Sequence, residues 1–341
     1  MVRRLLPEWA PLDGVMITWP HSGTDWEPYL DQIEPLYVNV AAVIARYAEL
    51  LIVCHDKALE QRVRGLLEHL PPNKLHFALA KTNDTWARDH GPISVSEDGR
   101  LKMLDFQFNA WGGKYKADDD NLINARIADQ GVFKPGLSTA PFELEGGAIE
   151  TDGLGTLLTT RANIYSGTRN LNLSQDSIES ELKRLLGVDR ILMLSHGHLS
   201  GDDTDSHIDT LARFCDEHSI AYVSCNDPAD EHYAELKMME DELKALRDRD
   251  GNPYRLFALP WPKPKFNEHG DRLPATYANF LICNAAVLVP TYDDAADEEA
   301  LKVMRTVFPN HEIVAVPCLP LILQYGSLHC MTMQLPEGSL K

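Results

Sequence analysis

Four short polar segments carry the residues best suited to chemistry in this sequence. Each places an acid, a histidine or a cysteine beside glycines, next to runs that resemble strands, where functional loops are usually presented. These segments are Thr85–Pro92, Leu144–Ile149, Gly201–Asp209 and Gly326–Thr332. Taken singly, each has an ordinary explanation as an ion pair, a turn, a solvated cap or a small buried cysteine. The functional case therefore depends on their combination.

Together the segments supply what hydrolysis of a guanidinium group requires. A guanidinium is planar, delocalised and always charged, so its carbon is a poor electrophile unless carboxylates align it below a strong nucleophile. A thiolate is such a nucleophile near neutral pH, and a carboxylate can grip two nitrogens at once. A histidine can protonate departing ammonia and later activate water. The residues that provide this set are Asp89, Glu145, His207, Asp209 and Cys330.

The spacing within two segments predicts which side chains face each other. His207 and Asp209 are one residue apart, so in an extended segment both would point to the same face. His329 directly precedes Cys330 and would point the opposite way on a strand, which makes it a poor candidate as the base for its neighbour.

Three alternatives from other classes remain open at the level of sequence. One is a metallohydrolase, because His196 and His198 precede a run of aspartates, although the spacing matches no known hydrolase metal motif. Another is an amidinotransferase or dimethylarginine hydrolase, which can share a Cys, His and acid arrangement on one fold. The third is a binding protein without catalytic activity.

The elements that must position these residues read as a mixed α/β pattern. Apolar runs rich in β-branched residues predict buried strands at 50–54, 156–159, 191–194, 280–283, 286–289 and 313–316. Helices are expected between them, at about 26–48, 57–70, 175–186, 229–248 and 296–307. Short turns join several strands, so mixed rather than purely parallel sheets are predicted. No repeat of fixed period is visible, and the Pro-rich stretch 260–266 is interpreted as a surface loop.

Composition narrows the classes of partner. The chain has 341 residues, is 44% hydrophobic and carries a formal net charge of −19, which disfavours nucleic acid and anionic membranes and suits a small cationic substrate. No stretch is long and apolar enough to span a bilayer, and no signal peptide is apparent. Six scattered cysteines without Cys-x-x-Cys pairs suit reduced thiols, so a cytoplasmic protein is expected.

Over nearly its whole length the chain resembles the agmatine deiminases, also called bacterial peptidylarginine deiminase-like proteins, of the guanidino-group-modifying (pentein) superfamily. The resemblance is carried by six motifs in the family's order: Trp19–His21 with Asp25–Trp26, Trp86–Pro92, Phe108–Tyr115, Glu145–Gly147, Asp205–Asp209 and Gly326–Cys330. It implies one catalytic domain over residues 1–341, an α/β propeller of five pseudo-symmetric ββαβ units around a central site. It also implies no metal and no organic cofactor, and it is compatible with a homo-oligomer.

The roles that the resemblance implies fall on matching positions of this sequence. Cys330 would be the nucleophile and His207 the general acid and base, while Asp89 and Asp209 would bind the guanidinium. Glu145 would contact both the guanidinium and His207. Trp86 and Trp111 would line the substrate site or simply fill the core. The implied reaction converts agmatine to N-carbamoylputrescine and ammonia, with free or peptidyl arginine as the alternative substrate.

Overall fold

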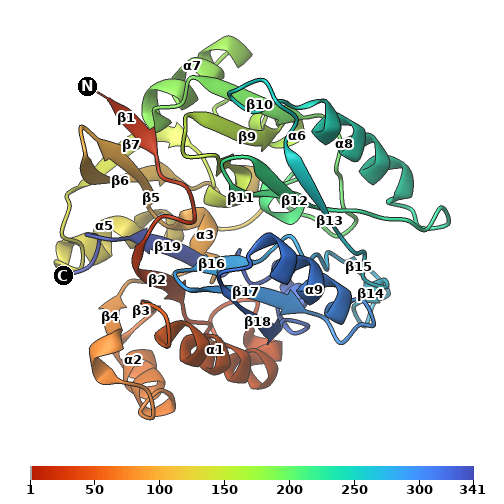
Figure 1. Ribbon diagram of the computed structural model, residues 1–341. Helices are drawn as coiled ribbons and strands as arrows, with labels where there is room; N and C mark the ends of the chain where they lie inside the picture. Colours follow the sequence, from red (N-terminus) through yellow and green to blue (C-terminus); the bar gives the residue numbers. More distant parts are fainter. Residues whose placement is uncertain (1) are drawn as a thin grey trace.

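The computed structural model describes residues 2–341, and within this range five sheets share one pattern of strand pairing (Figure 1). In each sheet an antiparallel pair of strands is followed by a third strand that runs parallel to the second. A helical segment always lies in the chain between the second and the third strand. Each unit is therefore a ββαβ element.

Three of the sheets consist of this unit alone. Their strands are β8 (Glu150–Thr151), β9 (Thr156–Thr160) and β10 (Arg190–Leu194); β11 (Ala212–Asp216), β12 (Ser219–Val223) and β13 (Arg255–Leu259); and β16 (Leu281–Cys283), β17 (Ala286–Thr291) and β18 (Glu312–Pro317). A separate two-stranded ribbon, β14 (Lys265–Phe266) and β15 (Arg272–Leu273), lies between the second and third of these sheets in the chain.

The other two sheets add one edge strand to the unit. In one, β1 (Arg3–Leu5) extends the unit of β5 (Ile93–Glu97), β6 (Arg100–Gln107) and β7 (Leu137–Glu143). In the other, the order is β19 (Thr332–Pro336), β2 (Leu12–Thr18), β3 (Glu49–Cys54) and β4 (Leu75–Leu79). Here the last strand of the chain pairs antiparallel with β2, with Thr332 opposite Ile17. The last strand of the chain thus completes a sheet whose other three strands lie within residues 12–79.

The long helices pack one apolar face against these sheets. They are α1 (Leu30–Ala45), α2 (Lys57–Leu66), α5 (Ile123–Asp129), α7 (Gln175–Leu186), α8 (Tyr233–Ala245) and α9 (Asp297–Val307). In α7 the buried residues include Ile178, Leu182 and Leu185, spaced by four and three positions as one helical face requires. Ser174 caps its first turn by accepting a hydrogen bond from the Ser177 N–H, and Gly187 ends it with a φ of 68°.

Short helical turns fill the loops between units. They are α3 (Ala87–His90), α4 (Ala110–Gly113), α6 (Arg161–Ile164), and the 3-10 turns η1 (Glu27–Tyr29), η2 (Pro72–Lys74), η3 (Asp120–Leu122), η4 (Gly146–Ala148), η5 (Ile208–Thr210) and η6 (Leu321–Gln324).

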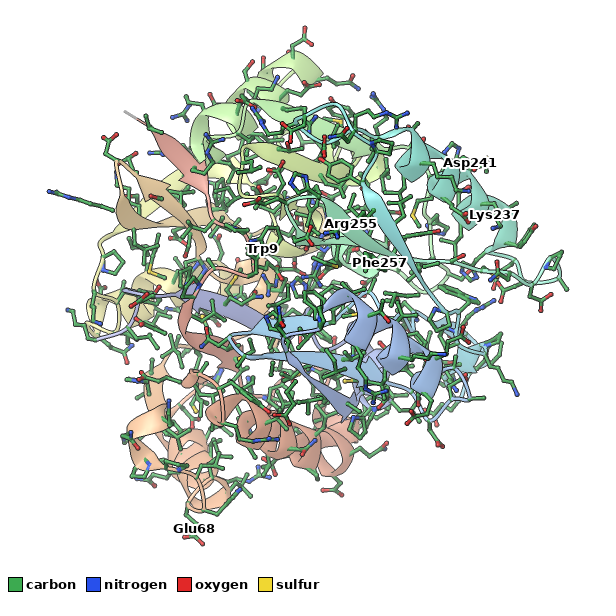
Figure 2. The ribbon with its side chains drawn as sticks, viewed as in Figure 1. Trp9, Glu68, Lys237, Asp241, Arg255 and Phe257 are labelled. Atoms are coloured by element: carbon green, nitrogen blue, oxygen red, sulfur yellow. The ribbon has the colours of Figure 1, made fainter. Side chains whose placement is uncertain are left out.

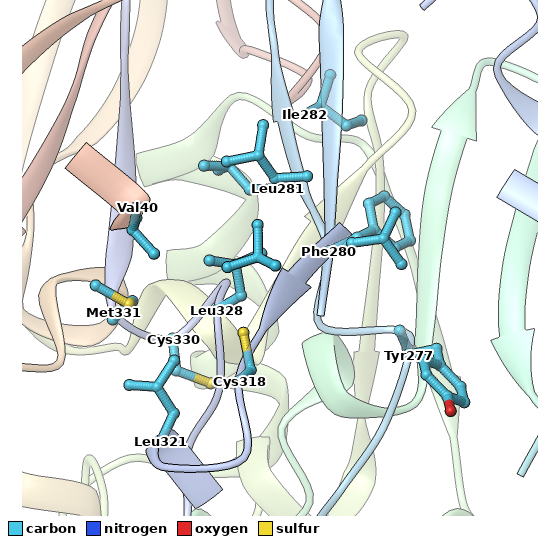
Figure 3. Close-up of a cluster of buried hydrophobic side chains, with 14 of the residues drawn as sticks. Val40, Tyr277, Phe280, Leu281, Ile282, Cys318, Leu321, Leu328, Cys330 and Met331 are labelled. Carbon is cyan, nitrogen blue, oxygen red and sulfur yellow. The ribbon is translucent and has the colours of Figure 1, made fainter. Parts of the chain in front are cut away.

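Charged residues such as Lys237 and Asp241 of α8 project from the outer surface (Figure 2). A buried apolar cluster that includes Phe280, Leu328 and Met331 surrounds the chain around Cys330 (Figure 3). The nucleophile candidate is thus embedded in the core.

The predicted strands and helices are confirmed, with small shifts at their ends. The segment predicted as one helix at 26–48 is divided into η1 and α1, while α7 matches its predicted bounds. Mixed sheets are also confirmed. The repeat, in contrast, was not found in the sequence, because the units share strand order but differ in loop and helix length.

All six cysteines are free thiols. None of the helices over residues 2–341 combines the length and the apolar character that crossing a bilayer demands.

Candidate active site

The predicted catalytic residues lie on four of the five connections that lead from one ββαβ unit to the next, whereas Trp111 lies inside a unit, in α4 between β6 and β7. Asp89 lies in α3 between β4 and β5, and Glu145 lies between β7 and β8. His207 and Asp209 lie between β10 and β11, and Cys330 lies between β18 and β19. The fifth connection, between β13 and β16, contributes Asn279, which the sequence reasoning missed.

Asp89 and Cys330 share a pocket with an empty volume of about 460 Å³. The two predicted tryptophans, Trp86 and Trp111, also line it. The remaining lining residues are Asp25, Asp84, Tyr115, Asp203, Thr204, Thr210, Gln324, Tyr325 and Gly326. A main-chain hydrogen bond of 3.1 Å from Arg88 N to Cys330 O ties the loop that carries the thiol to α3.

Gly147 explains why a Glu-Gly-Gly segment lies beside the site. A Cβ atom at this position would lie 2.6 Å from His207 Nδ1, 2.8 Å from Asp89 Oδ1 and 3.1 Å from Asp209 Oδ2. These three side chains therefore converge on the bare backbone of one glycine, where no larger residue leaves room for them. The Gly147 N–H also donates to Asp89 Oδ1 at 3.0 Å.

His207 and Asp209 converge for a reason other than the predicted one. The extended segment expected there is absent, because His207 caps the 3-10 turn η5 and Asp209 lies inside that turn. Their side chains nevertheless meet near Gly147. Both keep a buried polar atom without a hydrogen-bond partner, Nε2 of His207 and Oδ1 of Asp209. Buried polar atoms are normally paired, so these two mark the position where a polar ligand would bind.

The Cys330 thiol lies among groups that oppose its ionisation. Burial raises its pKa well above the usual value, and the charges of Asp209 and Asp89 add to this effect. Its Sγ is 3.8 Å from Asp209 Oδ2 and 3.3 Å from Asn279 Nδ2. Asn279 Oδ1 accepts from the backbone N–H groups of His329 and Cys330 at 2.8 and 3.3 Å. Asn279 thus holds both the thiol and its loop.

The acid and the histidine opposite the thiol are also perturbed. Burial, together with the charges of Asp209 and Glu145, raises the pKa of Asp89 well above its usual value. Burial lowers the pKa of His207 to about 3, so the imidazole is neutral near pH 7. His207 Nδ1 lies 3.6 Å from Asp89 Oδ1. Strong pKa shifts in a cluster of neighbouring buried groups are typical of catalytic sites.

Glu145 is paired with a residue that sequence reasoning did not single out. Arg169 Nε donates to both carboxylate oxygens, at 2.7 and 2.9 Å, and both side chains are almost fully buried. Burial raises the pKa of Glu145, and the Arg169 charge offsets part of this rise. Among residues 2–341 no hydrogen bond joins Glu145 to His207, so its implied contacts to His207 and substrate stay predictions.

The two tryptophans have distinct environments. Trp111 Nε1 donates to Asp89 Oδ2 at 2.9 Å from a backbone with a φ of 55°. Trp86 is buried beside Trp26, with ring centroids 5.8 Å apart, and a Cβ on Gly326 would meet its ring at 2.4 Å. Both therefore pack into the core and also wall the pocket.

The histidines of the metallohydrolase alternative do not form a ligand cluster with the aspartates that follow them. His196 Nδ1 lies 3.0 Å from Glu242, and Asp202 accepts hydrogen bonds from the backbone of Thr204 and Ser206. In the described part of the chain, the His, Cys, Asp and Glu groups close enough to hold an ion are Glu8, Glu150 and His329, and His218, Asp248 and Asp250. Arg213 already pairs with Glu8 and Glu150 in the first group.

The resemblance noted from the motifs extends to sequence and structure comparisons. An agmatine deiminase from Pseudomonas syringae pv. tomato is 32% identical, covering 96% of this chain and 94% of the relative. A Porphyromonas gingivalis structure, provisionally named an arginine deiminase, is 52% identical with a TM-score of 0.94, covering 99% of this chain and all of that one. A cysteine-to-serine variant of the agmatine deiminase of C. jejuni, with substrate bound, is 38% identical, with a TM-score of 0.92 and coverages of 99% and 97%.

A more distant likeness concerns the fold alone. An amidinotransferase from Microseira wollei is 12% identical, with a TM-score of 0.50 and coverages of 100% and 98%. The mixed α/β fold with several sheets is thus related to that of amidinotransferases. The model of the Porphyromonas-type peptidyl-arginine deiminase family matches residues 4–336. This chain therefore belongs to the Porphyromonas-type peptidyl-arginine deiminase family, whose members act as guanidino-group hydrolases.

Proposed function

We propose that this chain hydrolyses agmatine to N-carbamoylputrescine and ammonia, with Cys330 as the nucleophile. The observation that carries the proposal is the buried meeting of the Cys330 thiol with the carboxylates of Asp89 and Asp209. Two carboxylates beside a thiol are unfavourable without a cation, because burial and mutual repulsion both oppose their charges. A planar cation would relieve this repulsion and would fill the unpaired positions at Asp209 Oδ1 and His207 Nε2.

In the first half-reaction the Cys330 proton passes to neutral His207, and the thiolate attacks the guanidinium carbon. A C–S bond forms and a neutral tetrahedral species results. His207 then gives its proton to one nitrogen, the C–N bond breaks, and ammonia leaves. The product is a cationic S-alkylthiouronium on Cys330.

In the second half-reaction His207 accepts a proton from water, which attacks the same carbon. The C–S bond breaks, the electron pair returns to Cys330 as thiolate, and a urea group remains on the product. The hydroxyl proton of the tetrahedral species reprotonates the thiolate, and His207 releases its proton to solvent, where ammonia becomes an ammonium ion. Over both steps a guanidinium and water give a urea and an ammonium ion, which balances atoms and charge.

The charge of the pocket lining supports an amine, rather than a carboxylate, at the end of the substrate away from the guanidinium. Asp25, Asp84 and Asp203 line it, and no lysine or arginine is among the lining residues within 2–341. Arg88, a cation near the site in the sequence, is bound to Glu8 at 3.1 Å and to Gln334. The α-carboxylate of arginine would meet only like charge there.

The substrate assignment is tested by measuring ammonia and carbamoyl product from agmatine, arginine and an arginine-terminated peptide. We expect turnover of agmatine to exceed that of the other two by about 100-fold in kcat/KM, since an unpaired charge in such a pocket is costly. Cys330→Ser should be inactive, and Cys225→Ser, at a distant thiol, should behave as wild type. Equal turnover of arginine and agmatine would reject the assignment. Activity lost on chelation and restored by added metal would reject the cysteine mechanism.

We also propose that the five ββαβ units form one domain with five-fold pseudo-symmetry around this pocket. The support is topological: five sheets repeat one strand pattern, and the pairing of β19 with β2 completes one of the five units from segments at opposite ends of the chain. Each of the five connections between units supplies a residue to the site. Because residues 332–336 pair with residues 12–18, a circular permutant opened between two units should fold and retain agmatine turnover. A permutant that unfolds would contradict this arrangement.

A further inference from the structure

A chain of buried polar side chains leads from the N-terminal segment to the catalytic pocket. Glu8 Oε1 lies 2.7 Å from His329 Nε2, and His329 Nδ1 lies 2.8 Å from Asp209 Oδ2. His329 is fully buried, and Asp209 is as well. The imidazole of His329 therefore links Glu8 to Asp209, the proposed guanidinium-binding carboxylate, although residues 8 and 329 are more than 300 positions apart in the sequence.

The bond from His329 determines which oxygen of Asp209 is available. Oδ2 accepts the Nδ1–H of His329, whereas Oδ1 is buried without any partner among the described residues. Both the imidazolium and the neutral ring protonated at Nδ1 can donate this bond. Burial opposes ionisation of Asp209, but the His329 hydrogen bond and the charges of His329, His207 and Arg213 outweigh it and hold its pKa below the usual value.

The far side of the ring is equally constrained. Arg213 Nη2 lies 2.9 Å from His329 Nε2 and also binds Glu8. Glu8 accepts further bonds from Arg88 at 3.1 Å and from Gln334 at 2.9 Å. Arg213 is in turn paired with Glu150 and with two backbone carbonyl groups. This buried framework leaves the imidazole little freedom to rotate.

We infer that His329 is a positioning residue that fixes Asp209 so that Oδ1 faces the guanidinium, while Glu8 and Arg213 fix the ring of His329. This inference builds on the proposed function, because it assigns a purpose to the free oxygen of Asp209. It also gives a reason for the His-Cys pair in the sequence. The histidine faces away from the neighbouring thiol and acts through the acid that grips the substrate.

Two substitutions at His329 separate positioning from simple core filling. In Asn the amide nitrogen is bonded to Cγ, as Nδ1 is in histidine, so His329→Asn can keep the bond to Asp209. In Gln the amide lies one bond further out, at the place of Nε2, so His329→Gln removes it. We expect His329→Gln to lower kcat/KM for agmatine by about 10- to 100-fold, mainly through a higher KM, and His329→Asn to stay within about fivefold of wild type.

The matched control is His232→Gln. His232 is also buried, and its Nδ1 lies 2.8 Å from Asp230 Oδ1, yet it lies outside the pocket. We expect this variant to lose stability without a change in KM. Equal losses in both His329 variants, or none in either, would overturn the inference. If His329→Gln does not fold, Glu8→Gln provides the test: a loosened ring should raise KM at least about threefold, and an unchanged KM would overturn it.

A second readout does not depend on turnover. Chloroacetamidine is an amidinium cation that alkylates a thiol held beside carboxylates, whereas iodoacetamide is neutral. We expect His329→Gln to slow inactivation by chloroacetamidine about tenfold more than inactivation by iodoacetamide. If His329→Gln shows this selective slowing but wild type does not turn over agmatine, the proposed substrate is wrong and the positioning role stands. If His329→Gln is inactivated more slowly by both reagents to the same extent, the positioning role is wrong.

Discussion

Both carboxylate oxygens of Glu145 accept hydrogen bonds from Nε of Arg169, at 2.7 and 2.9 Å, and both side chains are buried. Arg169 also binds Asp205 at 2.7 Å and the carbonyl of Thr204, two residues in the segment that leads to His207. One guanidinium of the protein therefore connects two of the loops that form the site. Burial raises the pKa of Glu145, and the charge of Arg169 offsets part of that rise.

Removing this arginine should damage both stability and catalysis. In Arg169→Ala the carboxylate of Glu145 would be buried without a partner, which costs about 3–5 kcal/mol of unfolding free energy. We expect kcat to fall about 100-fold, because the loops of Glu145 and His207 lose their connection. Denaturant unfolding and steady-state kinetics measure the two effects. Arg169→Lys keeps the charge without the planar fork and should be intermediate; a kcat equal to wild type in both variants would contradict this role.

Gly147 should tolerate no side chain. A Cβ there would lie 2.6 Å from His207 Nδ1 and 2.8 Å from Asp89 Oδ1, so either the loop or the catalytic side chains must move. We expect Gly147→Ala to lower kcat by about 100-fold or more, because displacements near 1 Å are enough to disrupt aligned groups. Gly136→Ala is the matched control, since its Cβ would meet no atom within 4 Å. Wild-type rates in Gly147→Ala would show that the convergence is not needed.

Binding of a guanidinium should make the Cys330 thiol more acidic. Burial and the charges of Asp209 and Asp89 raise its pKa in the free protein, and a bound cation would neutralise those two carboxylates. We expect a fall of at least about one pKa unit when methylguanidine is bound. The thiolate absorbance of wild type minus that of Cys330→Ser, followed against pH, gives the value. The same pKa with and without ligand would reject substrate-assisted ionisation.

The affinity for agmatine should weaken as the pH falls below about 6. Burial raises the pKa of Asp84 to about 6, with help from the charge of Asp25, and burial raises that of Asp203 to about 6. Above this pH the two groups are charged and attract an amine, and on acidification they become neutral. We expect the KM ratio of agmatine to n-pentylguanidine, which has a methyl group in place of the amine, to rise about fivefold from about pH 7.5 to about pH 5.

Asp84→Asn provides the control for this pH effect. The carboxylate accepts hydrogen bonds from Thr85 N at 2.8 Å and Trp26 Nε1 at 3.2 Å, and the amide oxygen of asparagine can retain both. The variant should therefore fold normally but bind agmatine more weakly at neutral pH, with a smaller change in the ratio. If the KM ratio of agmatine to n-pentylguanidine does not depend on pH in wild type, the carboxylates of Asp84 and Asp203 do not bind the amine.

Local sequence was sufficient to predict most strands and helices, and it supplied the candidate site residues that folding brings together. Strand and helix positions follow from apolar periodicity, which is a property of neighbouring residues, and α7 even matches its predicted bounds. Asp89, Glu145, His207, Asp209 and Cys330 were singled out because together they supply the groups that guanidinium hydrolysis requires. The charge of −19 indicated a cationic ligand.

Only the tertiary structure decided how these residues cooperate. Asn279, Arg169 and Glu8 had no distinctive motif, because their roles depend on contacts 50, 24 and 321 positions away along the chain. The assumption of an extended segment at His207 was wrong, since a 3-10 turn there completes the convergence at Gly147. The proposed role of His329 also depends on contacts with residues that are distant in the sequence, Glu8 and Asp209. A sequence shows what a side chain can do, but partners brought together by folding determine which atom of it remains free.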